Sequence, residues 1–398
     1  MVSQLLELLN AYEEDPSVKL VIIKGEGKAF SAGGAVSVLL NVSWKEAAIL
    51  FSTAYALDYL IATYAKTQVS LIRGIVMGGG AAFAVHGRFR VVTDDTVFAM
   101  PETALGLFPD VGASYYLSRL PGFFGEYVGL TGARLDGAEM LACGLATHFV
   151  PLEKFSALED ALCKANTGDP KIINNIIHDF SNKNPKLKEK SQFFRYVFFF
   201  FWCNRENPSG KLMGSHQYIV KHNVHCREEE ADKNKDDWIS WTIKTLKKAS
   251  PTSLKISLRS IRTGRLQGVG QCLIREFRMS CTVVRGKVCR DFFEGCRALL
   301  VDKDKNPKVK DSKGNLGVLS GLGNGSKWIQ VAQVTLDLLA SCKPNTILFH
   351  FSLKNVNVID MITGQVGPWT CLQTLSCFFL ITKKCYCFKY GYKTILLQ

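Results

Sequence analysis

Three glycines and two carboxylates within residues 74–150 could together carry out chemistry on an acyl group. Gly78, Gly79 and Gly80 follow a short apolar segment, and Glu102 and Asp110 come later, in apolar surroundings punctuated by Gly and Pro. A helix that begins directly after a strand leaves backbone N–H groups without partners. Such donors can stabilise negative charge on a carbonyl oxygen, and carboxylates beside them can act as acid or base. Close packing of a helix on a strand would explain the glycines equally well.

A second donor could come from the loop at residues 30–34, which also ends in two glycines and follows a predicted strand. Two N–H groups aimed at one oxygen lower a barrier more than one does, since each contributes about 3 kcal/mol. These two glycine-rich loops are therefore candidates for the two halves of an oxyanion hole.

Glu102 and Asp110 each have a functional and a structural interpretation. The apolar residues around Glu102 would desolvate its carboxylate and raise its pKa towards the range of a general base. Alternatively, either acid could sit at the start of a helix as a cap. The two residues are eight positions apart across one loop, so they can face a common cavity.

Other polar residues are weaker candidates for chemistry. His86 and His148 lie in apolar settings without a nearby nucleophile, which favours a structural role. The glycine-rich segment 321–326 lacks the Lys-Ser/Thr ending of a phosphate-binding loop and is interpreted as a linker. Cys385 and Cys387 are too close together for the usual zinc spacing, so no metal site is predicted.

The elements that must position these residues alternate between strands and helices, which predicts an α/β sheet wrapped by helices. Beyond residue 150 the pattern becomes mainly helical, with helices expected at 152–165, 228–248 and 254–285. In the first part, strands are expected at 18–23, 68–74, 89–93, 97–100 and 147–150, and helices at 1–12, 45–64, 79–86, 112–120 and 138–144.

Composition excludes several classes of function. The net charge of +14 lies outside the candidate site, because residues 1–150 carry 10 Lys and Arg against 14 Asp and Glu. No nucleic-acid motif accompanies the basic residues, so nucleic-acid binding is not expected. The 13 cysteines have no regular spacing, which favours free thiols in a reducing compartment. The longest apolar run near the end, 369–382, is too short to span a membrane.

Several motifs together resemble the 3-hydroxyisobutyryl-coenzyme A hydrolases of the crotonase (enoyl-CoA hydratase/isomerase) superfamily. The resemblance covers about residues 1–190 and 227–307, and it implies a spiral of repeated ββα units followed by a helical region. Typical hydratases carry an additional Glu at the position of Ala82, which argues against hydration. The matching segments are 74–80, 86–90, 98–103, 108–112, 130–135, 146–150, 250–255, 291–295 and 303–307.

The resemblance implies hydrolysis of 3-hydroxyisobutyryl-CoA to CoA and 3-hydroxyisobutyrate, a step of valine breakdown. The thioester carbonyl would lie between the backbone N–H groups of Gly34 and Gly79. Glu102 would activate water or attack the carbonyl itself, and Asp110 would bind the substrate hydroxyl or assist proton transfer. No metal or separate cofactor is implied, because CoA is part of the substrate.

The chain also departs from the family pattern. The family's first strand is missing before residue 1, Ala35 replaces a loop-fixing acid, and Ala54 stands where an acid that contacts substrate is often found. We therefore predict a crotonase core at 1–165 without its first strand, and a helical region at 166–307 with a divergent insert near 194–226. A divergent, poorly ordered tail is expected at 308–398.

These departures leave two alternatives to the hydrolase. One is an inactive crotonase-fold fragment that binds acyl-CoA or partner subunits, and the other is a different crotonase reaction, such as hydration or isomerisation. A homo-oligomer is also an expectation. The resemblance implies a mitochondrial or peroxisomal protein, although the chain shows neither an Arg-rich leader nor a Ser-Lys-Leu ending.

Overall fold

The computed structural model describes residues 1–33, 36–197, 237–286 and 289–308, together with short strands at 352–353, 356–357 and 392–397. It contains two compact units, Met1–Lys313 with Phe388–Gln398, and Gly314–Cys387. The second unit contributes β9 (Ser352–Leu353) and β10 (Val356–Asn357), which pair antiparallel. The predicted insert and tail therefore lie mostly outside the described residues.

The first unit repeats a ββα pattern three times, as the fold prediction expected. In each repeat a long strand joins a five-stranded sheet of order β11-β1-β3-β5-β8, and the next, short strand joins a four-stranded sheet of order β2-β4-β6-β7. A helix then returns the chain to the next long strand. The strands are β1 (Leu20–Gly25), β2 (Ala29–Ser31), β3 (Thr67–Ile72), β4 (Ile75–Met77), β5 (Phe89–Val92), β6 (Val97–Ala99), β7 (Leu135–Asp136) and β8 (His148–Phe149).

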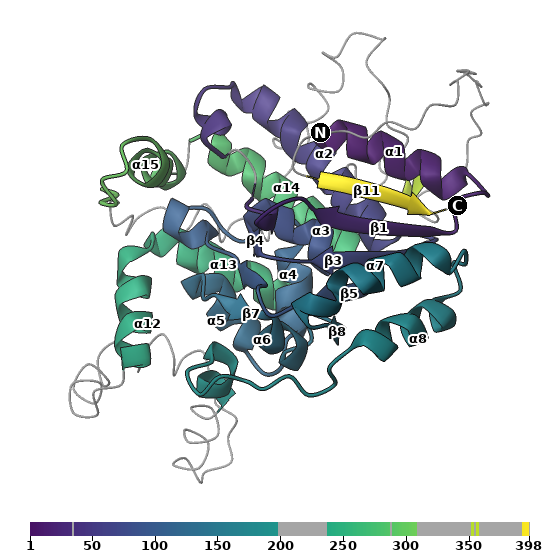
Figure 1. Ribbon diagram of the computed structural model, residues 1–398. Coiled ribbons are helices and arrows are strands. Elements are labelled where there is room, and N and C mark those ends of the chain that lie inside the picture. Colours follow the sequence, from purple (N-terminus) through teal and green to yellow (C-terminus); the bar gives the residue numbers. More distant parts are fainter. Residues whose placement is uncertain are drawn as a thin grey trace, which may run out of the picture. The chain divides into compact units, whose positions relative to one another are not determined.

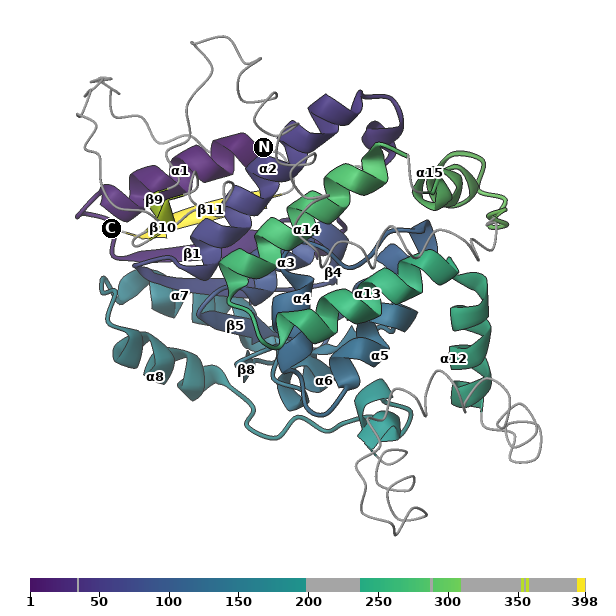
Figure 2. The same ribbon diagram turned by 180° about the vertical axis from the view of Figure 1, so that it is seen from behind.

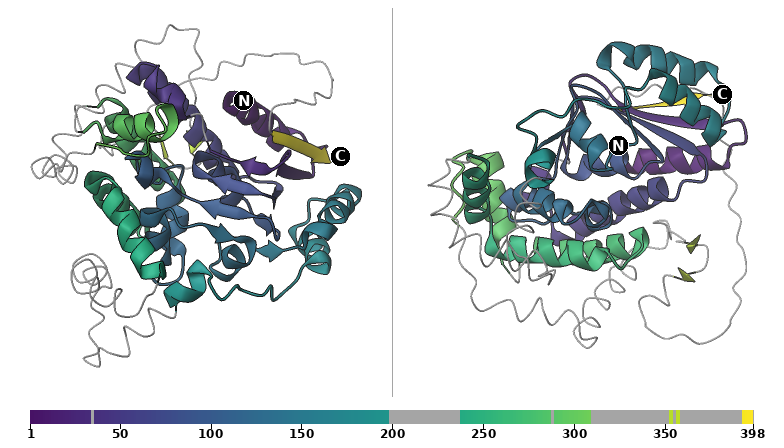
Figure 3. Two further views of the ribbon diagram at one scale, coloured as in Figure 1. Left: turned by 60° about the vertical axis from the view of Figure 1, so that its left-hand side comes forward. Right: turned by 90° about the horizontal axis from the view of Figure 1, so that it is seen from below.

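Helices cover both faces of the larger sheet (Figure 3). One face packs against α7 (Phe155–Lys164) and α8 (Pro170–Phe180), and the other against α1 (Val2–Glu14) and α2 (Trp44–Ala62). Because β1, β3, β5 and β8 run parallel and are covered on both faces, their residues are apolar almost without alternation. This buried sheet is the rigid base on which the candidate site stands.

The N-terminus of α2 is fixed by a capping box. The Ser43 hydroxyl accepts the Glu46 N–H at 3.3 Å, and the Glu46 carboxylate accepts the Ser43 N–H at 2.7 Å. The helix then runs for 19 residues and places Tyr55 and Asp58, three positions apart, among its buried residues.

The helical region contains α12 (Asp237–Lys248), α13 (Pro251–Gly264), α14 (Val269–Val284) and α15 (Asp291–Cys296). The prediction of one helix over 254–285 is wrong, because the chain turns between Gly264 and Gly268. A Cβ at Gly264 would lie 2.0 Å from the Ser114 carbonyl oxygen, so the helix meets the core there. The chain reverses, and α14 lies along α2 (Figure 2). The core also contains α3 (Ala81–Val85), α4 (Ala113–Tyr116), α5 (Phe124–Thr131) and α6 (Gly137–Ala142).

One described strand near the C-terminus was not predicted. β11 (Tyr392–Leu397) pairs antiparallel with β1, from Leu20 opposite Leu397 to Gly25 opposite Tyr392. Figure 1 shows it in yellow beside β1, close to α1. The edge of β1 that faces away from β3 is thus occupied by the far end of the chain.

Candidate active site

The triple glycine forms a tight turn between β4 and α3. Gly78, Gly79 and Gly80 make the 3-10 turn η2, and Gly78 has a φ of 58°, a conformation that favours glycine. A Cβ on Gly78 would lie 3.1 Å from Oε1 of Glu102, and one on Gly80 would lie 1.6 Å from the Ser31 hydroxyl oxygen. A side chain therefore has no room at Gly80 and would crowd Glu102 at Gly78.

The loop after β2 lies against this turn. Gly33 has a φ of 97°, and a Cβ there would be 3.2 Å from the Met77 carbonyl oxygen. Gly34 falls outside the described residues, so its predicted role as a donor stays a prediction. Gly79 lies in the first turn of a helical segment, where backbone N–H groups have no partner within the helix. The two glycine-rich loops predicted as a pair are therefore neighbours.

Glu102 stands over Gly78 with an oxygen free. It begins the 3-10 turn η3 (Glu102–Leu105), its residue is 5% exposed, and its Oε2 has no hydrogen-bond partner. Burial, and then the charge of Asp110, raise its pKa well above the ordinary value. The carboxylate is thus buried and close to the glycines, and its Oε2 takes part in no structural hydrogen bond.

Asp110 is equally buried but is held by a tyrosine. Its carboxylate accepts a 2.6 Å hydrogen bond from the Tyr55 hydroxyl, which also lies 2.9 Å from the Ser280 hydroxyl. Burial raises the pKa of Asp110 to about 6, and the bond from Tyr55 opposes that rise. Since α4 begins after Gly112, the side chain of Asp110 does not cap it.

The turn that follows Asp110 is strained and fixed by hydrogen bonds. Val111 has a φ of 55°, rare for a β-branched residue, and Gly112 has a φ of 79°. The His86 ring lies with Nε2 3.0 Å from the Val111 carbonyl, which can only accept, so Nε2–H donates. Burial lowers the pKa of His86 to about 4, so the ring is neutral and structural, as the sequence favoured.

Two further buried acids lie near Asp110, and neither was predicted from the sequence. Glu276 on α14 is fully buried, and Asp58 on α2 is 1% exposed with both carboxylate oxygens unpartnered. Burial raises the pKa of Glu276 to about 7 and that of Asp58 well above its usual range, and the charge of Asp110 raises both further. The sequence contained one signal for each: an acid on the otherwise apolar face of a predicted helix.

The two alanines singled out from the sequence are both in the core. Ala82 is fully buried at the start of α3, and Ala54 is partly buried on α2, packed against the main hydrophobic cluster. The Glu carboxylate expected of a hydratase is therefore replaced at residue 82 by a methyl group, one turn from Gly79.

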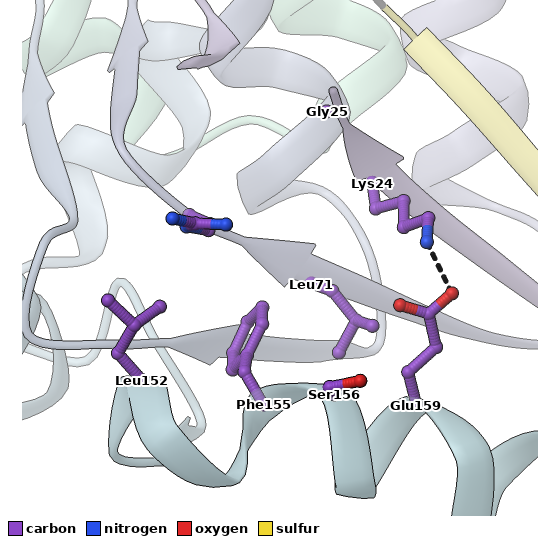
Figure 4. Close-up of a pocket in the computed structure, with 8 residues that line it drawn as sticks. Lys24, Gly25, Leu71, Leu152, Phe155, Ser156 and Glu159 are labelled. Carbon is purple, nitrogen blue, oxygen red and sulfur yellow. Dashed lines mark hydrogen bonds and ion pairs between the residues drawn. The ribbon is translucent and has the colours of Figure 1, made fainter. Parts of the chain in front are cut away.

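A separate surface pocket of about 430 Å³ lies between β1, β3 and α7 (Figure 4). Lys24 and Glu159 form an ion pair across it, with Leu71 and Phe155 as apolar lining. None of the candidate residues lines this pocket.

Within the described part of the chain, no cluster of three or more His, Cys, Asp or Glu residues could hold a metal ion. In the same residues no helix has the length and apolar character needed to cross a membrane.

The ββα repeat and the paired glycine loops define a crotonase-fold protein, and comparison with known proteins identifies the family. The family model for enoyl-CoA hydratase/isomerase matches residues 1–315. The chain therefore belongs to the enoyl-CoA hydratase/isomerase family. A solved carnitinyl-CoA dehydratase from Mycobacterium thermoresistibile is similar, with a TM-score of 0.63 and 30% identity over 77% of this chain and 83% of that one.

Curated relatives confirm the narrower resemblance drawn from the motifs. 3-Hydroxyisobutyryl-CoA hydrolase 1 of Arabidopsis thaliana is 59% identical over 77% of this chain and 79% of its own length. The mitochondrial 3-hydroxyisobutyryl-CoA hydrolase of Bos taurus is 39% identical over 78% and 77%. Small ribosomal subunit protein mS47 of Arabidopsis thaliana is also 39% identical, over 77% and 73%.

Proposed function

We propose that this protein hydrolyses the thioester of 3-hydroxyisobutyryl-CoA to CoA and 3-hydroxyisobutyrate, as a step of valine catabolism. Relatives named for this reaction support the choice of substrate. The observation that carries the chemistry is the dry carboxylate of Glu102 with one free oxygen, beside the glycine turn at Gly78.

The proposed reaction uses water and this chain's own groups. The thioester carbonyl lies between the N–H groups of Gly34 and Gly79, which stabilise the charge on its oxygen as the tetrahedral intermediate forms. Glu102 takes a proton from the attacking water, the C–S bond breaks, and the CoA thiolate receives a proton. Asp110 binds the hydroxyl of the acyl group or assists this proton transfer.

Glu102 could instead attack the carbonyl and form an acyl anhydride that water then hydrolyses. The two routes differ in where the oxygen of water goes only when water attacks the anhydride at the Glu102 carbonyl, because attack at the acyl carbonyl labels the product in both routes. A single turnover in H₂¹⁸O labels the product carboxylate if Glu102 activates water. If Glu102 is the nucleophile and water attacks the anhydride at the Glu102 carbonyl, the label enters the Glu102 side chain, which mass spectrometry of its peptide detects.

The central test is release of the CoA thiol from 3-hydroxyisobutyryl-CoA by purified protein and by Glu102→Gln. We expect the substitution to lower kcat by about 10³-fold, the range for loss of a general base. Glu126→Gln is a matched control, because Glu126 is a buried acid that pairs with Arg262 and Arg265 instead. Unchanged release by Glu102→Gln would remove Glu102 from the mechanism.

A second candidate function is binding without turnover. One relative is named as a ribosomal protein and not as a hydrolase. In addition, Ala54 stands at a position where an acid that contacts substrate is often found. CoA or acyl-CoA binding by a protein that releases no thiol would favour this candidate. Formation of a 3-hydroxyacyl-CoA from an enoyl-CoA would instead favour a hydratase, which Ala82 disfavours.

We further propose that the protein works in mitochondria, which the names of two relatives support. Fractionation of cells that express the full chain tests this, and a peroxisomal location remains the alternative. The reaction as proposed needs no cofactor besides the CoA of its substrate, and a homo-oligomer stays a prediction that light scattering can check.

A further inference from the structure

We infer that Glu276 is a positioning residue, whose carboxylate holds the strained turn that presents Asp110 to the substrate. The inference rests on the proposed function, in which Asp110 contacts the substrate hydroxyl or assists proton transfer. Glu276 lies on α14, 166 residues after Asp110, and does not itself belong to the glycine–Glu102 centre.

The carboxylate of Glu276 binds the turn at two successive points. Its Oε2 accepts the Gly112 N–H at 2.6 Å, and its Oε1 accepts the Ser114 N–H at 3.0 Å. The Ser114 hydroxyl donates to the same Oε1. All three hydrogen bonds are buried, so no water competes for the N–H and O–H donors of the turn.

The turn needs such support. Val111 has a positive φ, a strained conformation for a β-branched residue that persists only where the surroundings determine it. Without an acceptor, the buried Gly112 and Ser114 N–H groups would lose their hydrogen bonds at a further cost. Glu276 offsets both, so the backbone that follows Asp110 keeps one conformation.

The same helix supports the Asp110 side chain. Ser280 lies one turn after Glu276 on α14, within 2.9 Å of the Tyr55 hydroxyl that donates to Asp110. α14 therefore contacts the main chain of the turn through one residue and the carboxylate through Tyr55. Burying a carboxylate at Glu276 is costly, and here its oxygens accept three hydrogen bonds from the turn after Asp110.

Glu276→Gln tests this role, because it keeps the size of the side chain while its amide nitrogen would face an N–H donor. We expect kcat for 3-hydroxyisobutyryl-CoA to fall about 10- to 100-fold with little change in KM, as for a misplaced group in a formed site. Amide hydrogen exchange in the peptide spanning 107–116 should become faster. Glu126→Gln, a buried acid elsewhere, should leave both readings unchanged.

Ser114→Ala is a milder second variant, which removes the hydroxyl bond to Glu276 together with the 2.7 Å bond that this hydroxyl accepts from Arg275. It should give a smaller change of the same kind. Wild-type kcat and unchanged exchange at 107–116 in Glu276→Gln would overturn the inference. A fall in stability spread over the whole molecule, without a loss of kcat, would also overturn it. If the wild-type protein releases no thiol, the proposed function fails, and local exchange at 107–116 still decides whether Glu276 holds the turn.

Discussion

The segment that carries Glu102 and the turn that carries Asp110 are both buried, yet they are built in opposite ways. Glu102 keeps one oxygen without a partner and approaches Gly78 closely. Asp110 accepts a bond from Tyr55, and the two residues after it are held by His86 and Glu276. The difference separates a group free to exchange a proton from a group fixed in place.

This contrast assigns the two acids different work. A general base needs an oxygen that is not already held by a hydrogen bond, and Oε2 of Glu102 has no such partner. A group that orients a substrate must not move, and the turn at Asp110 has several constraints besides its own side chain. Changes that crowd Glu102 should therefore lower kcat more than changes around Asp110. Around Asp110, the loss of kcat should be smaller when more of the hydrogen bonds that hold the turn remain.

After Glu102→Gln, the largest loss of kcat is expected from Gly78→Ala. A Cβ at residue 78 would lie 3.1 Å from Oε1 of Glu102, so the carboxylate would have to shift slightly, and kcat should fall by up to about 100-fold, the cost of a displacement of about 1 Å. Gly144→Ala is the control, because Gly144 also has a positive φ, of 87°, but nothing lies within 4 Å of its Cβ. Steady-state kcat separates them, and equal losses in both would mean that backbone strain alone matters.

Asp110→Asn should have a smaller effect on kcat, about 10- to 100-fold, and a distinct effect on pH dependence. The charge of Asp110 raises the pKa of Glu102, so its removal lowers that pKa. A base works only when ionised, and activity is lost as pH falls through its pKa. The acid limb of the kcat/KM profile should thus move to lower pH, and an unmoved limb would show that the two acids are not coupled.

Tyr55→Phe should lower kcat about tenfold, because it removes one hydrogen bond to the Asp110 carboxylate. The loss is small because Glu276 still holds the turn after Asp110. That bond lowers the pKa of Asp110, so in the variant the pKa should rise above about 6. Tyr64→Phe is the control, because Tyr64 follows the end of α2 and its hydroxyl donates to the Leu9 carbonyl. This variant should leave the pH profile of kcat/KM unchanged. A shift of equal size in both would argue against a specific role for Tyr55.

Local pattern was enough to predict much of the core. The apolar runs at β1, β3 and β5 and the glycines at η2 are short-range signals, and the structure has strands and a turn there. Glu102 and Asp110 could be selected as candidates because Gly and Pro mark their loops. Glu276 and Asp58 were missed, since their importance depends on contacts with residues far along the chain. The break between α13 and α14 was missed because Gly264 is explained only by its contact with Ser114.

Asp58 extends the contrast to an acid with no hydrogen bond at all, and its effect should be on stability. Its raised pKa means that the folded chain holds a proton which the unfolded chain releases above a pKa of about 3.9. The free energy of unfolding of the wild-type protein therefore falls as pH rises above that value, whereas the side chain in Asp58→Asn is uncharged at every pH. Urea unfolding should show the variant more stable than the wild type at pH 8 and nearly equal to it at pH 4.

Asp160→Asn, a change at an exposed acid of α7, should alter stability little at either pH. A gain for Asp58→Asn of the same size at pH 4 and pH 8 would mean that packing and not ionisation separates Asn from Asp there. A loss at pH 8 would mean that the folded protein uses the charge of Asp58. In that case Asp58 would be a carboxylate that the folded protein holds in its ionised form, and the contrast between Glu102 and Asp110 would have to include a third acid.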